Sequence, residues 1–251
     1  DPKALKGAQY TTPINGALHR FATMLPDGMR GKSLLQRGTT PLVDRYVGNA
    51  FIFDETEKQA FFKHYNQNHP FQTMTRPFYD ESKRYDPIDQ MQFIDMHTWL
   101  NGDLLHNADR TALAHSLELR TPFVDREVFQ LASEIPADLK ISHGTTKFIL
   151  RQATVDLLPA AVLNRKKLGF PVPIRFWLKN EMYDWAKQII NDSQTDEYFD
   201  KQYFLKLLEV HRNGQKDYSR QIWTVLTFMV WHKIYVESEA LFENRGKGAK
   251  Y

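Results

Sequence analysis

The sequence predicts a mainly helical protein, and three observations support this class. Apolar residues recur at intervals of three and four along most of the chain, which is the spacing of a buried helix face. Segments that alternate apolar and polar residues, as strands do, are few. Prolines and short polar clusters separate the periodic segments. We therefore expect a single helical domain over residues 1–242, with any short strands in the first 50 residues, and a disordered basic tail over residues 243–251.

Capping residues and apolar spacing set the predicted helix boundaries. Asp54 stands before an acidic first turn, where the helix dipole favours negative charge, and marks a helix start. Asn213 and Gly214 mark an equally plain helix stop. The predicted helices are Gly16–Leu25, Thr40–Asn49, Glu55–Tyr65, Asp89–Leu100, Asp103–Ser116, Arg126–Glu134, Thr146–Leu158, Pro159–Leu163, Lys179–Asn191, Asp200–Asn213 and Asp217–Ser238. The last of these carries apolar residues nearly all round its circumference, so we expect it to be the central helix of the core.

Composition excludes several classes of function. The 251 residues include no cysteine, which removes thiol nucleophiles, thiolate metal sites and disulfides, and no two histidines have the i, i+4 spacing of helix-borne metal ligands. The 33 Lys and Arg residues nearly balance the 30 Asp and Glu residues, so we expect no nucleic-acid partner. The longest uncharged apolar stretch, Gln221 to Trp231, is shorter than the roughly 20 residues that span a bilayer. We expect a cytoplasmic protein with no membrane contact and no metal site of its own.

Four charged residues surround an otherwise apolar segment that runs from Asp109 to Asp125. Asp109 and Arg110 lie on a predicted helix. Glu118 and Arg120 flank the exit of that helix. Buried charges persist mainly when they are paired, so one interpretation is a buried ion-pair network that fixes how this helix meets the next. Direct contact with a ligand is the other interpretation.

A second stretch, Asn164 to Trp177, interrupts the helical rhythm. Gly169, Pro171 and Pro173 exclude a regular helix there, and chemistry is often carried by such loops. Three consecutive cations at residues 165–167 could form a solvated turn, a nucleic-acid patch or a phosphate grip that the prolines hold rigid. A lysine that must reach a phosphate benefits from a stiff loop, because less freedom is lost during the reaction.

Together the two stretches resemble a known pattern. DRTALAHSLELRTPFVD, from Asp109 to Asp125, is similar to DRxSMAxSLExRxPFLD. TKFILRQATVDLLPAAVLNRKKLGFPVPIRFWL, from Thr146 to Leu178, is similar to a run of the form K-x-x-L-R-x-A, LP, R-x-K-x-G-F, P and W. Both patterns are those of the C-terminal part of the synthetase domain of glutamine-dependent asparagine synthetase, and a fainter similarity extends from MLPDGMRGK to the last helix.

The resemblance implies an enzyme that makes an amide in two half-reactions on two domains. An N-terminal glutaminase frees ammonia from glutamine, while the synthetase domain joins ATP to the side-chain carboxylate of aspartate and releases pyrophosphate; ammonia then displaces AMP. ATP and Mg²⁺ are the implied cofactors of the complete enzyme. The lysine of the R-x-K-x-G-F pattern falls on Lys167, whose implied role is to hold an ATP phosphate and stabilise charge at the α-phosphorus. Arg165 and Lys166 are expected to add to the local positive potential.

The implied fold is the helical C-terminal portion of an α/β synthetase domain of the ATP-pyrophosphatase type, which is adenine nucleotide alpha hydrolase-like. The SGGxDS nucleotide loop of the family and its acidic SGxGxDE loop, which holds magnesium and pyrophosphate, do not occur in this sequence. We expect these loops and the glutaminase domain to lie upstream, and the chain by itself to be inactive and to bind no cofactor. We also expect an uncovered apolar face to drive formation of a homo-oligomer.

Two other classes of function remain as alternatives. A helical nucleic-acid-binding domain would use the predicted helices Asp103–Ser116 and Arg126–Glu134, with residues 165–167 on phosphate, but the interleaved acidic residues disfavour it. A purely structural helical module would leave Lys167 dispensable.

Overall fold

A computed structural model describes residues 13–25, 29, 31–48, 51–165 and 172–237. Helices account for most of these residues, which confirms the predicted helical class. The chain divides into two compact units, the first containing Asp1–Phe51 and Phe71–Lys167 and the second containing Ile52–Pro70 and Leu168–Tyr251. A single domain over residues 1–242 stays a prediction, and residues 243–251 lie outside the described part of the chain.

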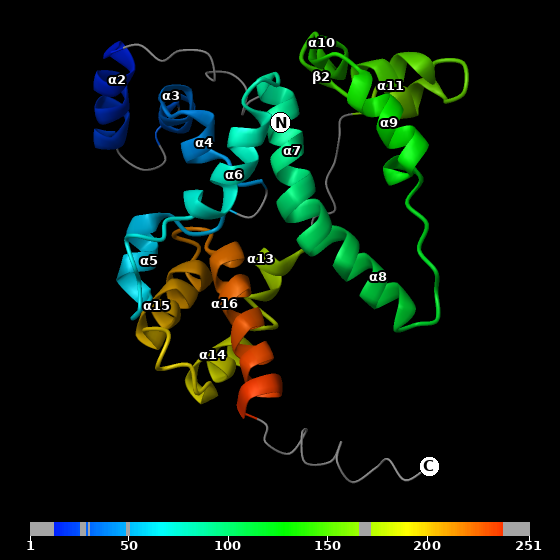
Figure 1. Ribbon diagram of the computed structural model, residues 1–251. Helices are drawn as coiled ribbons and strands as arrows, with labels where there is room; N and C mark the ends of the chain where they lie inside the picture. Colours follow the sequence, from blue (N-terminus) through cyan, green and yellow to red (C-terminus); the bar gives the residue numbers. More distant parts are fainter. Residues whose placement is uncertain (1–12, 26–28, 30, 49–50, 166–171, 238–251) are drawn as a thin grey trace. The chain divides into compact units, whose positions relative to one another are not determined.

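The first unit combines helices with a small hairpin (Figure 1). Figure 1 shows α7 and α8 as one continuous rod, because the π-helix η1 joins them without a break. The described elements of this unit are α2 (Pro13–Met24), α3 (Lys32–Thr39), α4 (Leu42–Arg45), α6 (Gln72–Ser82), α7 (Pro87–Asp95), η1 (Met96–Leu105), α8 (His106–Leu113), the 3₁₀-helix η2 (Pro122–Val124), α9 (Arg126–Glu134), α10 (Ala137–Lys140), β1 (Ile141–Ser142), β2 (Thr145–Thr146), α11 (Phe148–Ala153) and α12 (Ala160–Leu163).

Helix α7 begins where the sequence supplies two start signals. The Asp86 carboxylate accepts a hydrogen bond from the backbone N–H of Ile88 at 2.8 Å. Pro87 takes the first helical position, where its missing N–H leaves no bond unmade. The sequence predicts two separate helices, Asp89–Leu100 and Asp103–Ser116, and their separation is wrong, because the π-helix keeps the backbone helical from one to the other.

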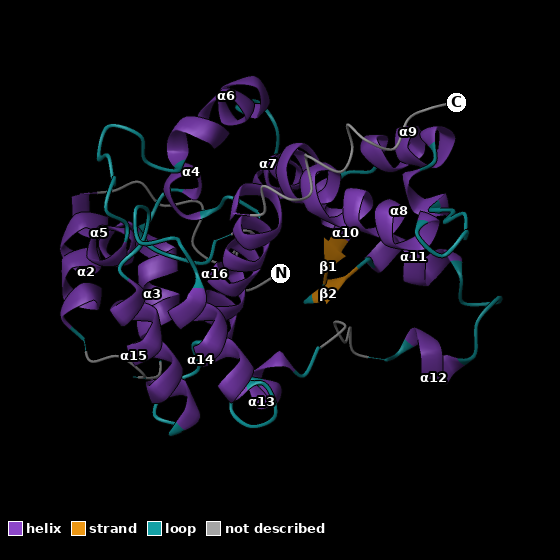
Figure 2. Ribbon diagram, turned by 90° about the horizontal axis from the view of Figure 1, so that it is seen from below, coloured by secondary structure: helices purple, strands orange, loops and turns teal. Residues whose placement is uncertain are grey.

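The strands of this unit lie at residues 141–146 and not in the first 50 residues, whose described part contains no strand. They pair antiparallel, with Ile141 opposite Thr146 and Ser142 opposite Thr145 (Figure 2). His143 and Gly144 connect them with φ values of 49° and 73°. Two successive residues of positive φ form the tight turn whose twist matches that of a hairpin. Alternation of side chains is too brief here to mark the strands in the sequence.

The second unit is a helical bundle with an aromatic core. Its described elements are α5 (Glu55–Phe61), α13 (Ile174–Trp177), α14 (Tyr183–Asp192), α15 (Lys201–Arg212), α16 (Ser219–His232) and the π-helix η3 (Lys233–Glu237), and Figure 1 shows α14, α15 and α16 packed side by side. The buried core residues are Phe61, Leu178, Tyr183, Ala186, Ile190, Phe204, Leu207, Leu208, Ile222, Val225, Leu226 and Met229. The ring of Phe204 lies 4.9 Å from that of Phe61 and 5.3 Å from that of Tyr203, measured between centroids.

Helix α16 is buried along one stripe, which corrects the expectation that it is surrounded by the core. Ile222, Leu226 and Met229 are buried at helical spacing. On the opposite side, Trp223 and Trp231 are exposed. The second unit therefore covers only part of the apolar surface of α16.

The capping signals are confirmed more often than the full lengths of the helices. Asp54 and Glu57 form a reciprocal capping box at the start of α5. Helix α15 ends before Asn213, and Gly214 adopts the left-handed conformation with φ 71°. Helix α6 is absent from the prediction because Pro77 lies inside it, and a proline normally interrupts a helix.

A half-buried carboxylate anchors α7 to the segment after α4. The Tyr46 hydroxyl donates to Asp95 Oδ2 at 2.7 Å, while Asp95 Oδ1 is buried without a hydrogen-bond partner among the described residues. A Cβ at Gly48, whose φ is 76°, would lie 2.7 Å from Oδ1, so only glycine lets the backbone approach this closely. Burial raises the pKa of the Asp95 carboxyl, although the hydrogen bond from Tyr46 opposes the shift.

Asp95→Asn is expected to make the chain more stable at neutral pH and to weaken its dependence on pH. With a raised pKa in the folded state, the stability associated with Asp95 is present below the ordinary pKa and is lost as the pH rises through the raised value. Urea denaturation of native chain and variant, followed by far-ultraviolet circular dichroism at about pH 7 and pH 4, measures the difference. An Asp95→Asn variant with the pH dependence of the native chain would contradict this account.

Helices in the described residues are too short, too polar or both to cross a lipid bilayer.

Candidate functional site

The loop that contains Lys167 is only partly within the described residues. Lys166 and Lys167 lie outside them, so the phosphate-binding role of Lys167 stays a prediction. Arg165 is described, and its side chain is exposed at the end of the turn that follows α12. The residues that flank the loop show how its two ends are held.

Arg151 of α11 holds the N-terminal end of this loop through backbone carbonyls. Its Nη1 donates to the carbonyl oxygen of Leu163, and its Nη2 donates to that of Arg165 at 3.1 Å. Its Nε donates to the carbonyl oxygen of Thr146 at 3.3 Å. The sequence pattern contains this arginine, but the pattern alone does not show that its guanidinium reaches carbonyls 12 and 14 residues further along the chain.

His211 holds the other end of the loop, within the second unit. Its ring is buried, and Nε2 lies 2.9 Å from the carbonyl oxygen of Arg175 in α13. The N–H of Tyr218 donates to Nδ1 at 3.3 Å, so we assign the ring hydrogen to Nε2, which then donates to Arg175. The adjacent Leu178 is fully buried in the core of this unit. The C-terminal end of the loop is therefore attached to the packed core of the second unit.

The first charged stretch is exposed in this structure and does not form the buried network expected from the sequence. The Arg120 guanidinium and the Glu118 carboxylate form an ion pair at 2.8 Å, with the two side chains 82% and 71% exposed. Asp109 and Arg110 lie on exposed positions of α8, and no ion pair joins either to another described residue. Apolar residues of the stretch, such as Phe123, are exposed too, so the solvation of the charges reflects an uncovered segment. A role for the four charged residues of this stretch in supporting a site stays a prediction.

One residue of this stretch has a clear local role. Asp125 caps α9, because its carboxylate accepts a hydrogen bond from the N–H of Glu127 at 3.0 Å. Helix α9 then runs from Arg126 to Glu134, as the sequence predicts. The final aspartate of the motif is therefore explained by helix initiation.

Three described non-glycine residues of the first unit adopt the left-handed conformation. Ser116 and Lys147 lie in the two motif stretches with φ values of 57° and 58°, and His143 lies in the hairpin turn with a φ of 49°. This conformation costs a non-glycine residue about 1 kcal/mol or more. Ser116 lies in the turn that ends α8, where the N–H of Leu117 donates to the carbonyl oxygen of Ala112 at 3.0 Å.

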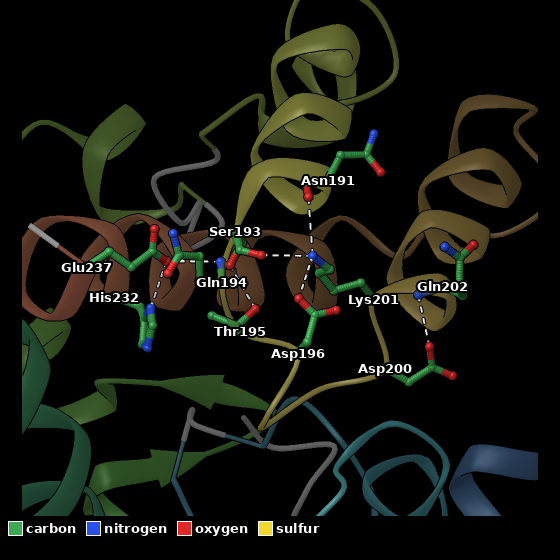
Figure 3. Close-up of polar contacts among 10 residues, drawn as sticks. All are labelled: Asn191, Ser193, Gln194, Thr195, Asp196, Asp200, Lys201, Gln202, His232 and Glu237. Carbon is green, nitrogen blue, oxygen red and sulfur yellow. Dashed lines mark hydrogen bonds and ion pairs between the residues drawn. The ribbon is translucent and has the colours of Figure 1, made fainter.

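Another polar cluster lies in the second unit (Figure 3). Lys201 donates to the carbonyl oxygen of Ser193 at 2.8 Å and pairs with Asp196 at 2.8 Å. The Glu237 carboxylate accepts hydrogen bonds from His232 at 2.9 Å and from the N–H of Gln194 at 3.0 Å. Burial alone would raise the pKa of Glu237, but these two hydrogen bonds hold it below its ordinary value. The charged groups of this cluster are paired with one another. Through Glu237, the cluster joins the loop between α14 and α15 to the end of α16.

Comparison with known proteins identifies the family. The profile described as asparagine synthase matches residues 15–233. The asparagine synthetase [glutamine-hydrolyzing] 1 of Bacillus subtilis is 54% identical over 244 residues, which are 97% of this chain and 39% of that protein. An asparagine synthetase [glutamine-hydrolyzing] of Gallus gallus is 31% identical over 134 residues, 46% of this chain and 24% of that protein.

A third relative carries a different name. The amidase chry2 of Gibberella zeae is 24% identical over 158 residues, 59% of this chain and 24% of that protein. No solved structure is a significant match. The chain thus spans about two fifths or less of the length of these relatives. Since the family profile matches residues 15–233 of the 251, the chain belongs to the asparagine synthase family.

Proposed function

We propose that the chain is the helical C-terminal portion of the synthetase domain of a glutamine-dependent asparagine synthetase, an ATP-dependent carbon–nitrogen ligase of the cytoplasm. The observation that carries this proposal is the alignment with the Bacillus subtilis synthetase over 97% of the chain. That alignment includes 39% of the relative. The glutaminase domain and the α/β layer of an ATP-pyrophosphatase fold would be supplied by the remainder.

The proposed reaction has two steps. A carboxylate oxygen of aspartate forms a bond to the α-phosphorus of ATP, the bond from that phosphorus to the bridging oxygen breaks, and pyrophosphate leaves. Ammonia released from glutamine then attacks the acyl carbon of β-aspartyl-AMP, loses a proton and displaces AMP. Negative charge accumulates on the phosphoryl oxygens in the first step. The ammonium group of Lys167, held in a site with little water, would stabilise that charge by about 3 kcal/mol. Arg165 and Lys166 would raise the positive potential around it.

Magnesium is assigned to the part of the enzyme outside this sequence. Among the described residues, no group of three or more histidine, aspartate or glutamate side chains is arranged to hold a metal ion. The acidic SGxGxDE loop of the family, which this sequence lacks, would supply the ligands. No step of the proposed reaction depends on a metal bound by this chain.

Exposed apolar side chains support the assignment to a larger enzyme. They lie between α8 and α12 and include Leu113, Leu117, Leu119, Phe123, Val128, Leu131, Leu157 and Val162. Soluble monomers rarely leave so much apolar surface uncovered unless it is an interaction site. We infer that the remainder of the synthetase covers these side chains, and that copies of the chain associate through them when the remainder is absent.

The reaction is tested in a complete synthetase that contains this chain. Supplied with ATP, aspartate and ammonia, the enzyme is expected to release pyrophosphate and AMP in amounts equal to the asparagine formed, and glutamine should replace ammonia. Pyrophosphate release that does not depend on aspartate would contradict the assigned substrate. Release that depends on another carboxylate would replace aspartate with that compound.

The chain alone is expected to bind ATP more weakly than about millimolar. One cationic loop can contact a phosphate, but a nucleotide site also needs groups that enclose the phosphates and the base, and the SGGxDS loop is absent from the sequence. Isothermal calorimetry of the chain with ATP measures the affinity, with the complete synthetase as the positive control. A dissociation constant of about 1 mM or tighter, equivalent to about 4 kcal/mol of binding free energy, would show that these residues already form a site.

A further inference from the structure

We propose that Arg151 is a positioning residue for the phosphate-binding loop: its guanidinium fixes the chain at Leu163 and Arg165, immediately before Lys167. The proposal deepens the function proposed above and rests on the role of Lys167 given there. It is carried by three hydrogen bonds between described residues of one compact unit.

The three bonds connect segments that are separate in the sequence. Arg151 lies on α11, and its nitrogen atoms donate to the carbonyl oxygens of Thr146, Leu163 and Arg165. The Leu163 carbonyl belongs to the last turn of α12, where carbonyl groups have no partner within the helix. The guanidinium therefore caps α12 and holds the residue two positions beyond its end.

This arrangement requires arginine rather than any cation. The guanidinium carries five N–H donors in a planar fork, and three of its nitrogen atoms each face a different carbonyl oxygen here. A lysine ammonium is a single point that cannot occupy all three positions. Among the described residues, no carboxylate lies within ion-pair distance of Arg151. Its charge is thus directed at the backbone and is not used in a salt bridge.

Chain length decides which anchor positions Lys167. Lys167 is two residues after Arg165, and two residues of extended chain reach at most about 7 Å. The Arg165 carbonyl, fixed by Arg151, is therefore an anchor close to Lys167 along the chain. The anchor on the other side of the loop, the bond from His211 to Arg175, is eight residues from Lys167, a reach of up to about 29 Å. Arg151 therefore holds the anchor nearer to Lys167 along the chain, and we infer that it lowers the conformational freedom lost when phosphate binds.

Hydrogen exchange of the 251-residue chain tests the anchor without any ligand. The variants are Arg151→Ala and Arg151→Lys, with Arg126→Ala as the control, because Arg126 is an exposed arginine of the same unit. Both Arg151 variants are expected to exchange the amides of Asn164 and Arg165 about tenfold faster, since these amides bond within the turn that Arg151 caps. Exchange in α7 and in the control variant should stay as in the native chain.

Two results would overturn the proposal. If Arg151→Lys exchanges these amides at the native rate, charge alone is enough and the fork has no positioning role. If exchange accelerates equally throughout the first unit, Arg151 is a general stabilising residue. Arg151→Lys retains the charge and the stem of the side chain, so it keeps the test decisive if Arg151→Ala fails to fold.

A second readout connects the anchor to the reaction. In the complete synthetase, Arg151→Lys is expected to lower kcat for amide synthesis by about tenfold or more, with a smaller change in the KM for ATP and no change in glutamine hydrolysis. Unchanged kcat would contradict a positioning role. The two proposals fail separately: a harmless Lys167→Ala substitution would remove the proposed function but would leave the exchange result intact.

Discussion

Replacing Lys167 by alanine in the complete synthetase is expected to lower the rate of amide synthesis by at least about 100-fold and to leave glutamine hydrolysis largely intact. The first step of the proposed reaction would concentrate negative charge on the phosphoryl oxygens, and removing one group that stabilises such charge commonly costs this much in kcat. The proposed glutaminase reaction would take place on another domain and would use none of this charge. Parallel assays of glutamate release and pyrophosphate release measure the two activities in the same preparation.

The controls for this experiment separate chemistry from folding. Lys206→Ala removes an exposed lysine of α15 and is expected to retain the native rates. Lys167→Arg keeps the charge but spreads it over a planar group, so it should recover only part of the activity. Equal loss of synthesis and glutamine hydrolysis in Lys167→Ala would show that Lys167 has a structural role instead.

Phe204→Ala is expected to destabilise the second unit by about 3–5 kcal/mol, the usual cost of removing a buried phenylalanine ring. Phe204 is completely buried, and its ring contacts those of Phe53, Phe61, Phe199 and Tyr203. The alanine would leave a cavity between α5 and α15 that their backbones can fill only by moving. Such a loss is a large fraction of the stability of a domain of this size.

Tryptophan fluorescence during urea denaturation reports on this unit. Four of the five tryptophans, all except Trp99, belong to the second unit, so their signal follows its unfolding. Phe176→Ala makes the same truncation where the side chain is 55% exposed and is expected to cost less than about 1 kcal/mol. If the two variants lost equal stability, Phe204 would not belong to a closely packed core.

Local signals in the sequence predict helix ends better than they predict helix surroundings. Asp54, Asp125 and Asp200 cap the helices that follow them, because a cap depends on atoms only two or three residues away. The surroundings of α16 depend on what packs against it, which apolar periodicity does not reveal. Helix α6 contains Pro77, and its buried Tyr79 donates to the carbonyl oxygen of Tyr46, a contact across 33 residues that no local pattern shows.

The candidate site also combines features that the sequence indicates with features that only the structure shows. The resemblance to the family pattern points to Lys167, whereas the cations and prolines alone also allow a solvated turn or a nucleic-acid patch, and the role of Lys167 stays a prediction. The same pattern leaves Arg151 unnoticed, since its partners are backbone carbonyls and any residue could supply them. The sequence pattern also does not predict that Glu118 and Arg120 are exposed, because charged residues in a motif do not reveal which surface covers them.

The π-helix between α7 and α8 changes how this rod would respond to the loss of a residue. A π segment holds more residues per turn than an α-helix, as an α-helix does where it has absorbed an extra residue. Loss of one codon between Met96 and Leu105 would let a π turn return to α-helical winding, and the side chains of α8, Asp109 and Arg110 among them, would keep nearly the same direction. Loss of one codon within α8 would instead rotate every later side chain by about 100° around the axis, so the rod should accept a deletion in its π segment far more readily than one in α8.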